Sequence, residues 1–195
     1  KRKLEWGDIL EIKHRFITEP VPASAREDPP AQRLAAAKLY ADYGTPHYEY
    51  RRVHDPNGIG KFFMGREIAI VMGHQGADWL ERPERVEEEK PDDLVNLLDL
   101  KPGMNVADIG AGTGYISWRM AKKVGPEGRV YAVEIQQEML DLLAKKMPER
   151  GVKNVQDVLG TIQHANLQPK SIDLAMMVDV YHEFSHPLEM LKSIV

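Results

Sequence analysis

The second half of the chain alternates short apolar runs with longer segments in which apolar residues recur every three or four positions. A short apolar run bounded by turn residues predicts a buried strand, and the longer periodicity predicts a helix. The predicted strands are 104–110, 129–135, 154–159 and 171–178, and the predicted helices are 115–124 and 136–150. Strands that alternate with helices indicate βαβ units. We therefore predict an α/β fold with a doubly wound, mostly parallel sheet of the Rossmann-like type.

Residues 1–90 lack this alternation and form a predicted N-terminal extension, helical and irregular, of a core at 91–195. The extension is expected to contain, in chain order, a Pro-rich linker near 20–30, a helix over 31–43, an irregular stretch over 44–60 and a short apolar element, helix or strand, over 64–73. The acidic run 87–89 is expected on a solvated helix face, and Pro91 opens the next helix. The extension is a candidate cover for an active site.

The composition fits a globular domain, since 43% of the 195 residues are hydrophobic and 29% are charged. A net charge of −4 gives no general attraction to nucleic acid, and no apolar run approaches the roughly 20 residues of a transmembrane helix. The absence of cysteine excludes disulfides, thiolate metal sites and a cysteine nucleophile. Because the chain begins at Lys1 rather than Met, a removed signal peptide is left open.

The stretch "VADIGAGTGY" places Gly110, Gly112 and Gly114 in a turn between a strand and a helix, with Asp108 at the strand end. Glycine tolerates positive φ and lets a ligand approach the backbone, so the turn is a candidate ligand site, with a plain βα turn as the alternative. A dinucleotide site would need G-x-G-x-x-G. Tyr115 replaces its third glycine and would crowd the packing of helix on strand, which disfavours a nucleotide-dependent oxidoreductase.

Glu134 ends the next predicted strand, where an acid can accept hydrogen bonds from both hydroxyls of a ribose. Asp108 and Glu134 therefore both lie at strand ends, the edge at which such sheets bind ligands. The pair favours a ligand that contains an adenosine with free 2′ and 3′ hydroxyls.

Together, "VADIGAGTGY" and "VYAVEI" resemble the cofactor-binding core of class I S-adenosylmethionine-dependent methyltransferases, over about residues 91–195. The segment 65–85, "GREIAIVMGHQGADWLERPER", resembles the N-terminal extension of some bacterial proteins of this type. The resemblance implies S-adenosylmethionine as cofactor, with its methionine part at Asp108 and 110–114, its ribose at Glu134 and its adenine against Ile135. The cofactor-binding residues implied are Asp108, Gly110, Ala111, Gly112, Thr113, Gly114, Glu134, Ile135, Gly160, Thr161 and Asp179.

The sequence departs from the family pattern after the third predicted strand. Many members carry Gly-Asp there, and the Asp bonds the adenine amino group, whereas this chain has Gly160-Thr161. Asp157 lies too early in the strand to replace that acid. Either Thr161, Ile162 or a backbone group takes the adenine bond, or adenine binding is weaker.

Residues 182–186, "HEFSH", fit the H-E-x-x-H pattern of zinc metalloproteases, which needs both histidines on one helix face. Here a buried strand leads into the motif, and Pro187 pushes His186 out of helical conformation. The two rings are therefore not expected to share a helical face, and we predict a metal-free protein.

The same stretch resembles the Asp/Asn-x-x-His found in many of these methyltransferases after the fourth strand, matched here by Asp179 and His182. The resemblance implies that Asp179 and Tyr181 line the methyl-transfer pocket and that His182 orients the acceptor or takes its proton. Asp179 and His182 are thus the catalytic candidates, the alternative for His182 being a hydrogen bond to loop backbone. Glu183 and His186 are expected to be structural.

The family strand order, 3-2-1-4, leaves the later strands of a full domain outside these residues, so the chain is expected to be C-terminally truncated. The fourth strand would then have an open edge and uncovered apolar side chains, such as Leu174, Met176 and Val178. Unless the N-terminal extension covers them, this edge should promote self-association.

We predict a methyltransferase that acts on a small-molecule acceptor, without a nucleic acid partner or a membrane span. A non-catalytic cofactor-binding module is the alternative, because of Thr161 and the missing strands. A cytoplasmic location is favoured, since the cofactor is found there, and a periplasmic one would require a removed signal peptide.

Overall fold

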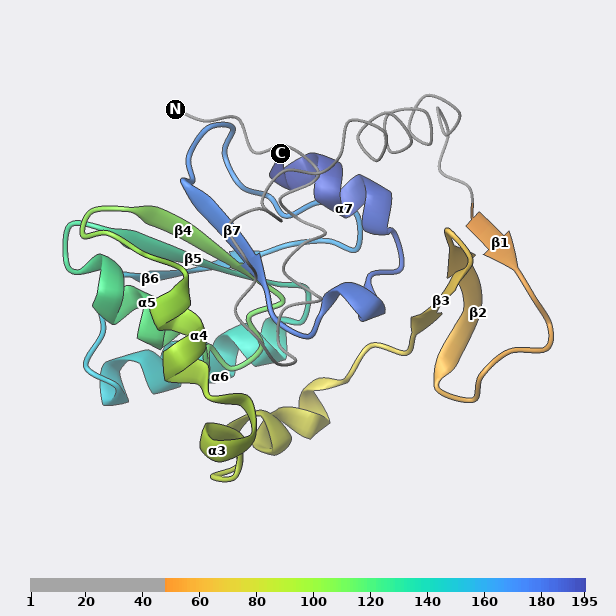
Figure 1. Cartoon of the computed structure of the whole chain (residues 1–195), viewed down its shortest axis with the longest axis horizontal. Coiled ribbons are helices and arrows are strands. Elements are labelled where there is room, and N and C mark those ends of the chain that lie inside the picture. Colours follow the sequence, from red (N-terminus) through yellow and green to blue (C-terminus); the bar gives the residue numbers. More distant parts are fainter. Residues whose placement is uncertain (1–47) are drawn as a thin grey trace, which may run out of the picture. The chain divides into compact units, whose positions relative to one another are not determined.

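The computed structural model describes residues 48–195, so the Pro-rich linker and the helix predicted over 31–43 lie outside the described residues. The centre of the fold is a parallel sheet in the order β6-β5-β4-β7 (Figure 1). Its strands are β4 (Asn105–Ile109), β5 (Arg129–Glu134), β6 (Val155–Leu159) and β7 (Leu174–Met177). The third, second, first and fourth core strands thus lie side by side, which confirms the predicted α/β fold and its strand order.

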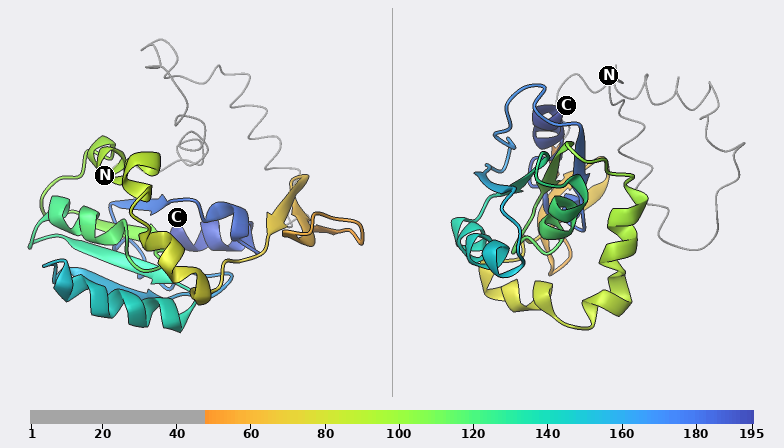
Figure 2. Two further views of the ribbon diagram at one scale, coloured as in Figure 1. Left: turned by 90° about the horizontal axis from the view of Figure 1, so that it is seen from below. Right: turned by 90° about the vertical axis from the view of Figure 1, so that its left-hand side faces the viewer.

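Both faces of the parallel sheet are covered. Val106 and Ala107 are neighbours in β4 and both are fully excluded from solvent. Because successive side chains of a strand point to opposite faces, each face must carry its own layer. One face packs against α4 (Pro91–Leu97), α5 (Ser117–Val124) and α6 (Gln137–Glu149), and the other packs against α7 (Pro187–Ile194) and the loop 160–173 (Figure 2).

Residues before the core form a second, antiparallel sheet, followed by two short helices. The strands are β1 (Tyr48–Tyr50), β2 (Gly58–Phe63) and β3 (Arg66–Ala69), and the helices are the 3-10 helix η3 (His74–Glu81) and α3 (Arg85–Glu89). Met64 and Gly65, both at positive φ, make the two-residue turn between β2 and β3, as hairpins favour.

The expectation of irregular structure over 44–60 is wrong for β1 and the start of β2. The turn residues were recognised, but they connect two strands that pair with each other. The backbone N–H of Asn57 donates to the Asp55 carboxylate, and that of Gly58 donates to the Asp55 carbonyl. These bonds close the turn that ends in β2. The apolar element over 64–73 contains the strand β3, which decides between the two predicted alternatives.

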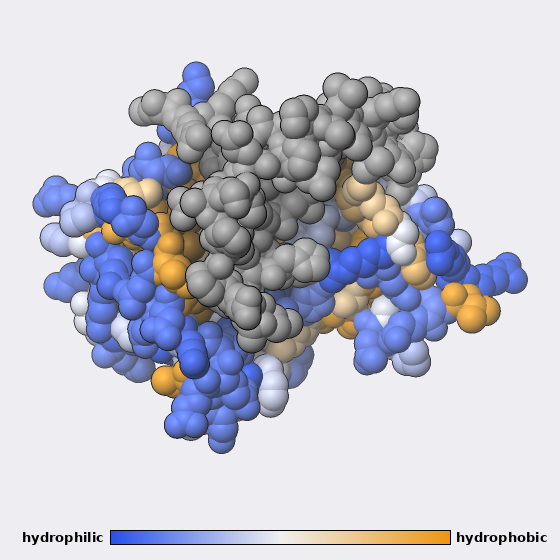
Figure 3. All heavy atoms as spheres, viewed as in Figure 1, coloured by the Kyte–Doolittle hydropathy of each residue, from blue (hydrophilic) through white to orange (hydrophobic). Residues whose placement is uncertain are grey.

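The acidic run 87–89 lies exposed at the end of α3, as predicted. Hydrophilic side chains gather over α3, α4 and α5 on the face shown in Figure 3. Within residues 48–195, the structure contains no helix with the length and apolar character needed to cross a membrane.

Within the described residues, β7 is an edge of the parallel sheet, because it pairs with β4 alone. The expectation that its apolar side chains are uncovered is wrong for Met176, which is 3% exposed. Met176 belongs to the core cluster that includes Val95 of α4 and Val106 of β4, and Leu174 and Val178 pack against the same cluster. The helix α4, which comes before the sheet in the chain, therefore helps to cover the apolar side chains of β7.

Replacing Gly114 by alanine should destabilise the fold by roughly 2–5 kcal/mol. Gly114 has a φ of 76°, and a Cβ there would lie 2.8 Å from Met147 Cε and 2.9 Å from Leu143 Cγ. Left-handed backbone costs a non-glycine residue about 1–2 kcal/mol, and overpacking adds about 1–3 kcal/mol. Gly151→Ala is the matched control, because its φ is 69° and no atom lies within 4 Å of the added carbon. Equal losses in urea unfolding would contradict the packing argument.

Candidate functional site

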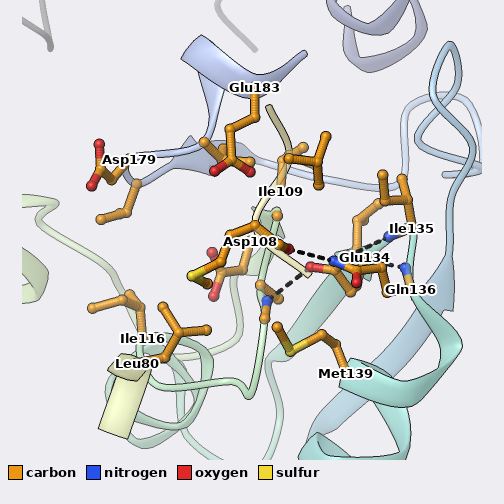
Figure 4. A pocket seen from close by; sticks show the side chains of 18 of the residues that line it. Leu80, Asp108, Ile109, Ile116, Glu134, Ile135, Gln136, Met139, Asp179 and Glu183 are labelled. Atoms are coloured by element: carbon orange, nitrogen blue, oxygen red, sulfur yellow. Dashed lines mark hydrogen bonds between the residues drawn. The ribbon is translucent and has the colours of Figure 1, made fainter. Parts of the chain in front are cut away.

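A pocket lies at the carboxyl ends of β4, β5 and β7, at the point where the strand order reverses direction. Open α/β sheets bind ligands at this edge, because the loops that follow neighbouring strands separate there. The loops after the three strands supply most of the lining, and residues between Val71 and Glu89 supply a further wall. Figure 4 shows side chains from these segments converging on one space.

The glycine loop presents bare backbone to this pocket. Gly110 and Gly112 have φ values of 74° and 52°, which favour glycine. A Cβ on Gly110 would lie 2.3 Å from Val180, and a Cβ on Gly112 would lie 2.7 Å from Leu80. The backbone N–H groups of Gly110 and Ala111 both donate to the carbonyl of Val133 in β5, so the loop is fixed to the sheet.

Asp108 is a buried acid at the end of β4, with 3% of its surface exposed. The hydroxyl of Ser117 donates to its carboxylate over 2.6 Å. Burial raises the pKa of Asp108 to about 6, and the Ser117 bond and the nearby Arg85 charge oppose that rise. A charged carboxylate in such a place is poorly compensated by the protein, and a cationic ligand group beside it would supply the missing compensation.

Glu134 is a buried acid at the end of β5 whose carboxylate is held by backbone groups (Figure 4). Gly112 N–H donates to Oε2 over 3.1 Å. Ile135 N–H and Gln136 N–H donate to Oε1 over 2.7 and 3.0 Å. A carboxylate has about four acceptor positions, so Glu134 retains acceptor capacity on Oε2.

The tip after β7 brings three polar side chains to another side of the pocket. Asp179, at a φ of 51°, precedes the short 3-10 helix η4 (Tyr181–Glu183). His182 Nδ1 lies 3.6 Å from an Asp179 oxygen, and His182 Nε2 lies 3.8 Å from a Glu183 oxygen. Glu183, expected to be structural, directs its carboxylate into the pocket, whereas Asp179 points away from it (Figure 4).

The two histidines of "HEFSH" do not share a helix, as predicted. His182 belongs to η4, Phe184 is extended with a φ of −65° and a ψ of 110°, and α7 starts after His186. His186 instead contacts Ser185 Oγ at 3.0 Å and meets the Tyr48 ring edge-on. In the part of the chain that the structure describes, no three acidic or histidine side chains are grouped so as to hold a metal ion.

Several predicted cofactor residues lie beside the lining rather than in it. Thr113 is fully buried, and its hydroxyl donates to Glu81 of η3. Gly114 packs against α6. The Thr161 hydroxyl accepts the backbone N–H groups of Gln163 and His164, which makes a tight turn that leaves the neighbouring Ile162 in the lining. Gly160 and Tyr181 also lie outside the lining, contrary to expectation. The remaining predicted site residues line the pocket: Asp108, Gly110, Ala111, Gly112, Glu134, Ile135, Asp179 and His182.

Tyr115 does not crowd the loop, which corrects the expectation drawn from the missing third glycine. Its buried ring lies between the guanidinium groups of Arg85 and Arg119, each 4.3 Å from the ring centre. The ring also belongs to the core cluster that includes Val106 of β4 and Met120 of α5, so the packing accommodates it. Tyr115 instead contributes to the pocket wall.

The sequence did not predict which residues between Val71 and Glu89 form the further wall of the pocket. Gln136 fixes it, because its amide donates to the Met72 carbonyl and accepts from His74 N–H, both over 2.9 Å. Glu81 fixes it again through an ion pair with Arg150, the residue that directly follows α6. Lining residues outside the prediction include Val71, Met72, Trp79, Leu80, Arg82, Arg85, Glu89, Gln136, Met139 and Glu183. The available signal was the resemblance of segment 65–85, which does not say which side chains face inward.

Comparisons with known proteins agree with this geometry. The family described as "Methyltransferase domain" matches residues 100–195. A solved S-adenosylmethionine-dependent methyltransferase from Aquifex aeolicus is similar, with 31% identity and a TM-score of 0.61 over 64% of this chain and 66% of that chain. The protein-L-isoaspartate O-methyltransferase of Methanothrix thermoacetophila is 39% identical over 67 residues, and nocamycin O-methyltransferase of Saccharothrix syringae is 36% identical over 67 residues.

The chain belongs to the class I S-adenosylmethionine-dependent methyltransferases. S-adenosylmethionine is the cofactor of this family. Each of these two relatives matches 34% of this chain. The matched segment spans 32% of the isoaspartate enzyme and 24% of the nocamycin enzyme.

Replacing Asp108 by asparagine should stabilise the ligand-free protein at neutral pH. The folded-state pKa of about 6 lies above the ordinary value of 3.8, so the folded protein holds the proton more tightly. Asp108 therefore favours folding below about pH 4, and that contribution is lost as pH rises through 6, by about 3 kcal/mol. Urea unfolding between pH 4 and 7 should show a flatter pH dependence for Asp108→Asn. Asp141→Asn on the exposed face of α6 is the control, and an unchanged slope in both variants would contradict the assignment.

Proposed function

We propose that this protein transfers a methyl group from S-adenosylmethionine to a small-molecule acceptor. The observation that carries the proposal is the pair of buried acids, Asp108 and Glu134, at the ends of adjacent strands beside a glycine loop. An amino acid joined to a nucleoside needs a partner for its ammonium group and a partner for its ribose at a short, fixed separation. Neighbouring parallel strands provide such a separation.

The residues present fit the cofactor. Asp108 would hold the ammonium group, the 110–112 backbone would approach the methionine part, and Glu134 would accept the ribose hydroxyls. Ile135, Met139 and Ile162 would form the apolar surroundings of the adenine. Thr113 and Gly114 would act by shaping the loop, and Gly160 and Thr161 by holding the turn that presents Ile162.

The cofactor supplies an activated methyl group for in-line displacement. The protein's part in such a step is mainly to align the acceptor and exclude water, which needs few catalytic side chains. The wall from η3 and the segment before it serves the exclusion of water, because Met72, Trp79 and Leu80 line the pocket opposite the strand ends. Of the two predicted catalytic candidates, His182 is the proposed acceptor-side residue and orients the acceptor, because the exposed Asp179 side chain points away from the pocket.

A small acceptor is favoured by the mixed lining and by two relatives. Nocamycin O-methyltransferase and aklanonic acid methyltransferase DauC of Streptomyces, 31% identical over 83 residues, are named for small molecules, whereas the isoaspartate enzyme is named for a protein. The net charge of −4 gives a large polyanion no reason to approach.

Glu134→Ala should weaken binding of S-adenosylhomocysteine by about 1.5–3 kcal/mol, the scale of lost hydrogen bonds to a charged group. Calorimetry on the folded variant measures this change. Glu138→Ala is the control, because Glu138 lies exposed on the first turn of α6, outside the pocket lining. Equal affinities of wild type and Glu134→Ala would remove Glu134 from the ribose site.

The function itself is tested by offering S-adenosylhomocysteine and NAD to the same protein. We expect S-adenosylhomocysteine to bind and NAD to leave no signal at the same concentration. Labelled S-adenosylmethionine with a pool of hydroxylated and amino-substituted small molecules should then yield labelled product. Cofactor binding without any labelled product from this pool or from protein extracts would favour the non-catalytic module instead.

A further inference from the structure

Glu183 is the inward-facing acid to which the proposed cofactor contacts assign no cofactor group. Five acids line the pocket: Glu89, Asp108, Glu134, Asp179 and Glu183. Arg82 and Arg85 neutralise Glu89 over 2.9 and 2.6 Å. The proposed function uses Asp108 and Glu134, and the Asp179 side chain is 87% exposed. Glu183 is 19% exposed and points into the pocket (Figure 4).

The surroundings of Glu183 make its negative charge costly. Burial is the main cause, and the negative charges of Asp179 and Glu134 act in the same direction. The backbone N–H of Met72 donates to the carboxylate and opposes these effects. Other charged or titratable groups near η4 include His182, 3.8 Å away, and Arg66 of β3, which lies over the ring of Tyr181 at 5.7 Å. Lys61 is also near, because its ammonium group donates to the carbonyl of Ser185. Together, these effects raise the pKa of Glu183 above its ordinary value.

The connectivity of the cofactor directs its methyl group toward this side. Its sulfur links the ribose to the amino-acid chain, so it lies between the groups held by Glu134 and by Asp108. Two of the three sulfur substituents are thereby committed to the loops after β5 and β4. The third, the methyl group, is left to face the remaining sides of the pocket, which include the loop after β7.

We propose that Glu183 accepts the acceptor's proton during methyl transfer, and that the acceptor is therefore a hydroxyl or amine that attacks through an atom carrying hydrogen. This inference rests on the proposed function. In the step, the bond from oxygen or nitrogen to carbon forms, the sulfur–carbon bond breaks and its electron pair stays on sulfur. The proton passes from the attacking atom to a Glu183 oxygen.

Loss of the sulfonium charge during methyl transfer favours proton transfer to Glu183. A positive sulfonium facing Glu183 favours the ionised carboxylate, as an opposite charge within about 4–6 Å lowers a carboxyl pKa by about 1–3 units. Transfer of the methyl group removes that positive charge at the moment when the acceptor releases its proton. Glu183 then gains proton affinity when a base is needed. His182 lies between Glu183 and the exposed Asp179, with Nε2 3.8 Å from a Glu183 oxygen and Nδ1 3.6 Å from an Asp179 oxygen.

The proposal is testable without knowledge of the acceptor, by comparing two ligands that differ by one methyl group and one charge. Binding of S-adenosylmethionine and of S-adenosylhomocysteine is measured by calorimetry near pH 6.5, in buffers of different ionisation enthalpy. The slope of enthalpy against buffer enthalpy gives the protons taken up. The effect of the shared ammonium and carboxylate groups on Asp108 cancels in the difference. Any effect of the sulfonium charge on Asp108 is separated from that on Glu183 by the Glu183→Gln variant.

For the wild type we expect binding of S-adenosylhomocysteine to take up more protons than binding of S-adenosylmethionine. The difference should approach about one proton at a pH between the Glu183 pKa values of the two complexes. Glu183→Gln should abolish the difference. At higher pH the same substitution should reduce the preference for S-adenosylmethionine over S-adenosylhomocysteine by about tenfold or more. Glu183→Asp, which keeps the charge, should retain a proton difference, and Glu138→Gln should match the wild type.

The outcomes distinguish a failure of the proposed role of Glu183 from a failure of the proposed function. Binding of both ligands with equal proton uptake in the wild type, or a difference that survives Glu183→Gln, overturns the role of Glu183 and leaves the proposed function standing. Failure of the wild type to bind either ligand overturns the proposed function and this inference together.

Discussion

The site is organised around two carboxylates buried beside each other at the ends of adjacent parallel strands. Asp108 and Glu134 are each less than a tenth exposed, and the charge of Glu134 adds to the burial that raises the Asp108 pKa. Burying like charges together is unfavourable unless nearby dipoles or a ligand compensate. Three backbone N–H groups hold Glu134, one hydroxyl holds Asp108, and Arg85 lies near enough to oppose the Asp108 shift. The glycine loop brings a backbone N–H, that of Gly112, to the Glu134 carboxylate without a side chain in the way.

A second constraint is that the wall of the pocket comes from a part of the chain that is distant in sequence. Its attachments are polar and specific: Gln136 to Met72 and His74, Glu81 to Thr113 and Arg150. The Glu81 attachments join the wall to the glycine loop and to α6 at once. A change in that wall is therefore transmitted to the loop that would hold the cofactor, although Glu81 does not itself line the pocket.

The core was predictable because its signals are local. Apolar runs with turns between them defined the four strands, and the glycine spacing with Asp108 defined the loop. The sequence could not predict in which direction individual side chains point. Thr113 lies within the glycine motif yet turns to Glu81, and Glu183 is adjacent to His182 yet faces the pocket. In η4, a single 3-10 turn, no long periodicity marks the inward face. The short strand β1 was missed for a related reason, since three residues are too few to show alternation.

The charge of the site also bears on turnover. An acidic pocket favours a cationic ligand, and the cofactor carries a positive sulfonium in addition to its balanced ammonium and carboxylate groups. Once the methyl group has left, the sulfur is neutral, while the acids that line the pocket are unchanged in position. The attraction that held the cofactor is then weaker for the product, by an amount that depends on how close the acids lie and how dry the pocket is. The same unfavourable burial that makes the ligand-free site costly thus assists release of the product, and the arrangement of acids serves both the binding and the departure of the ligand.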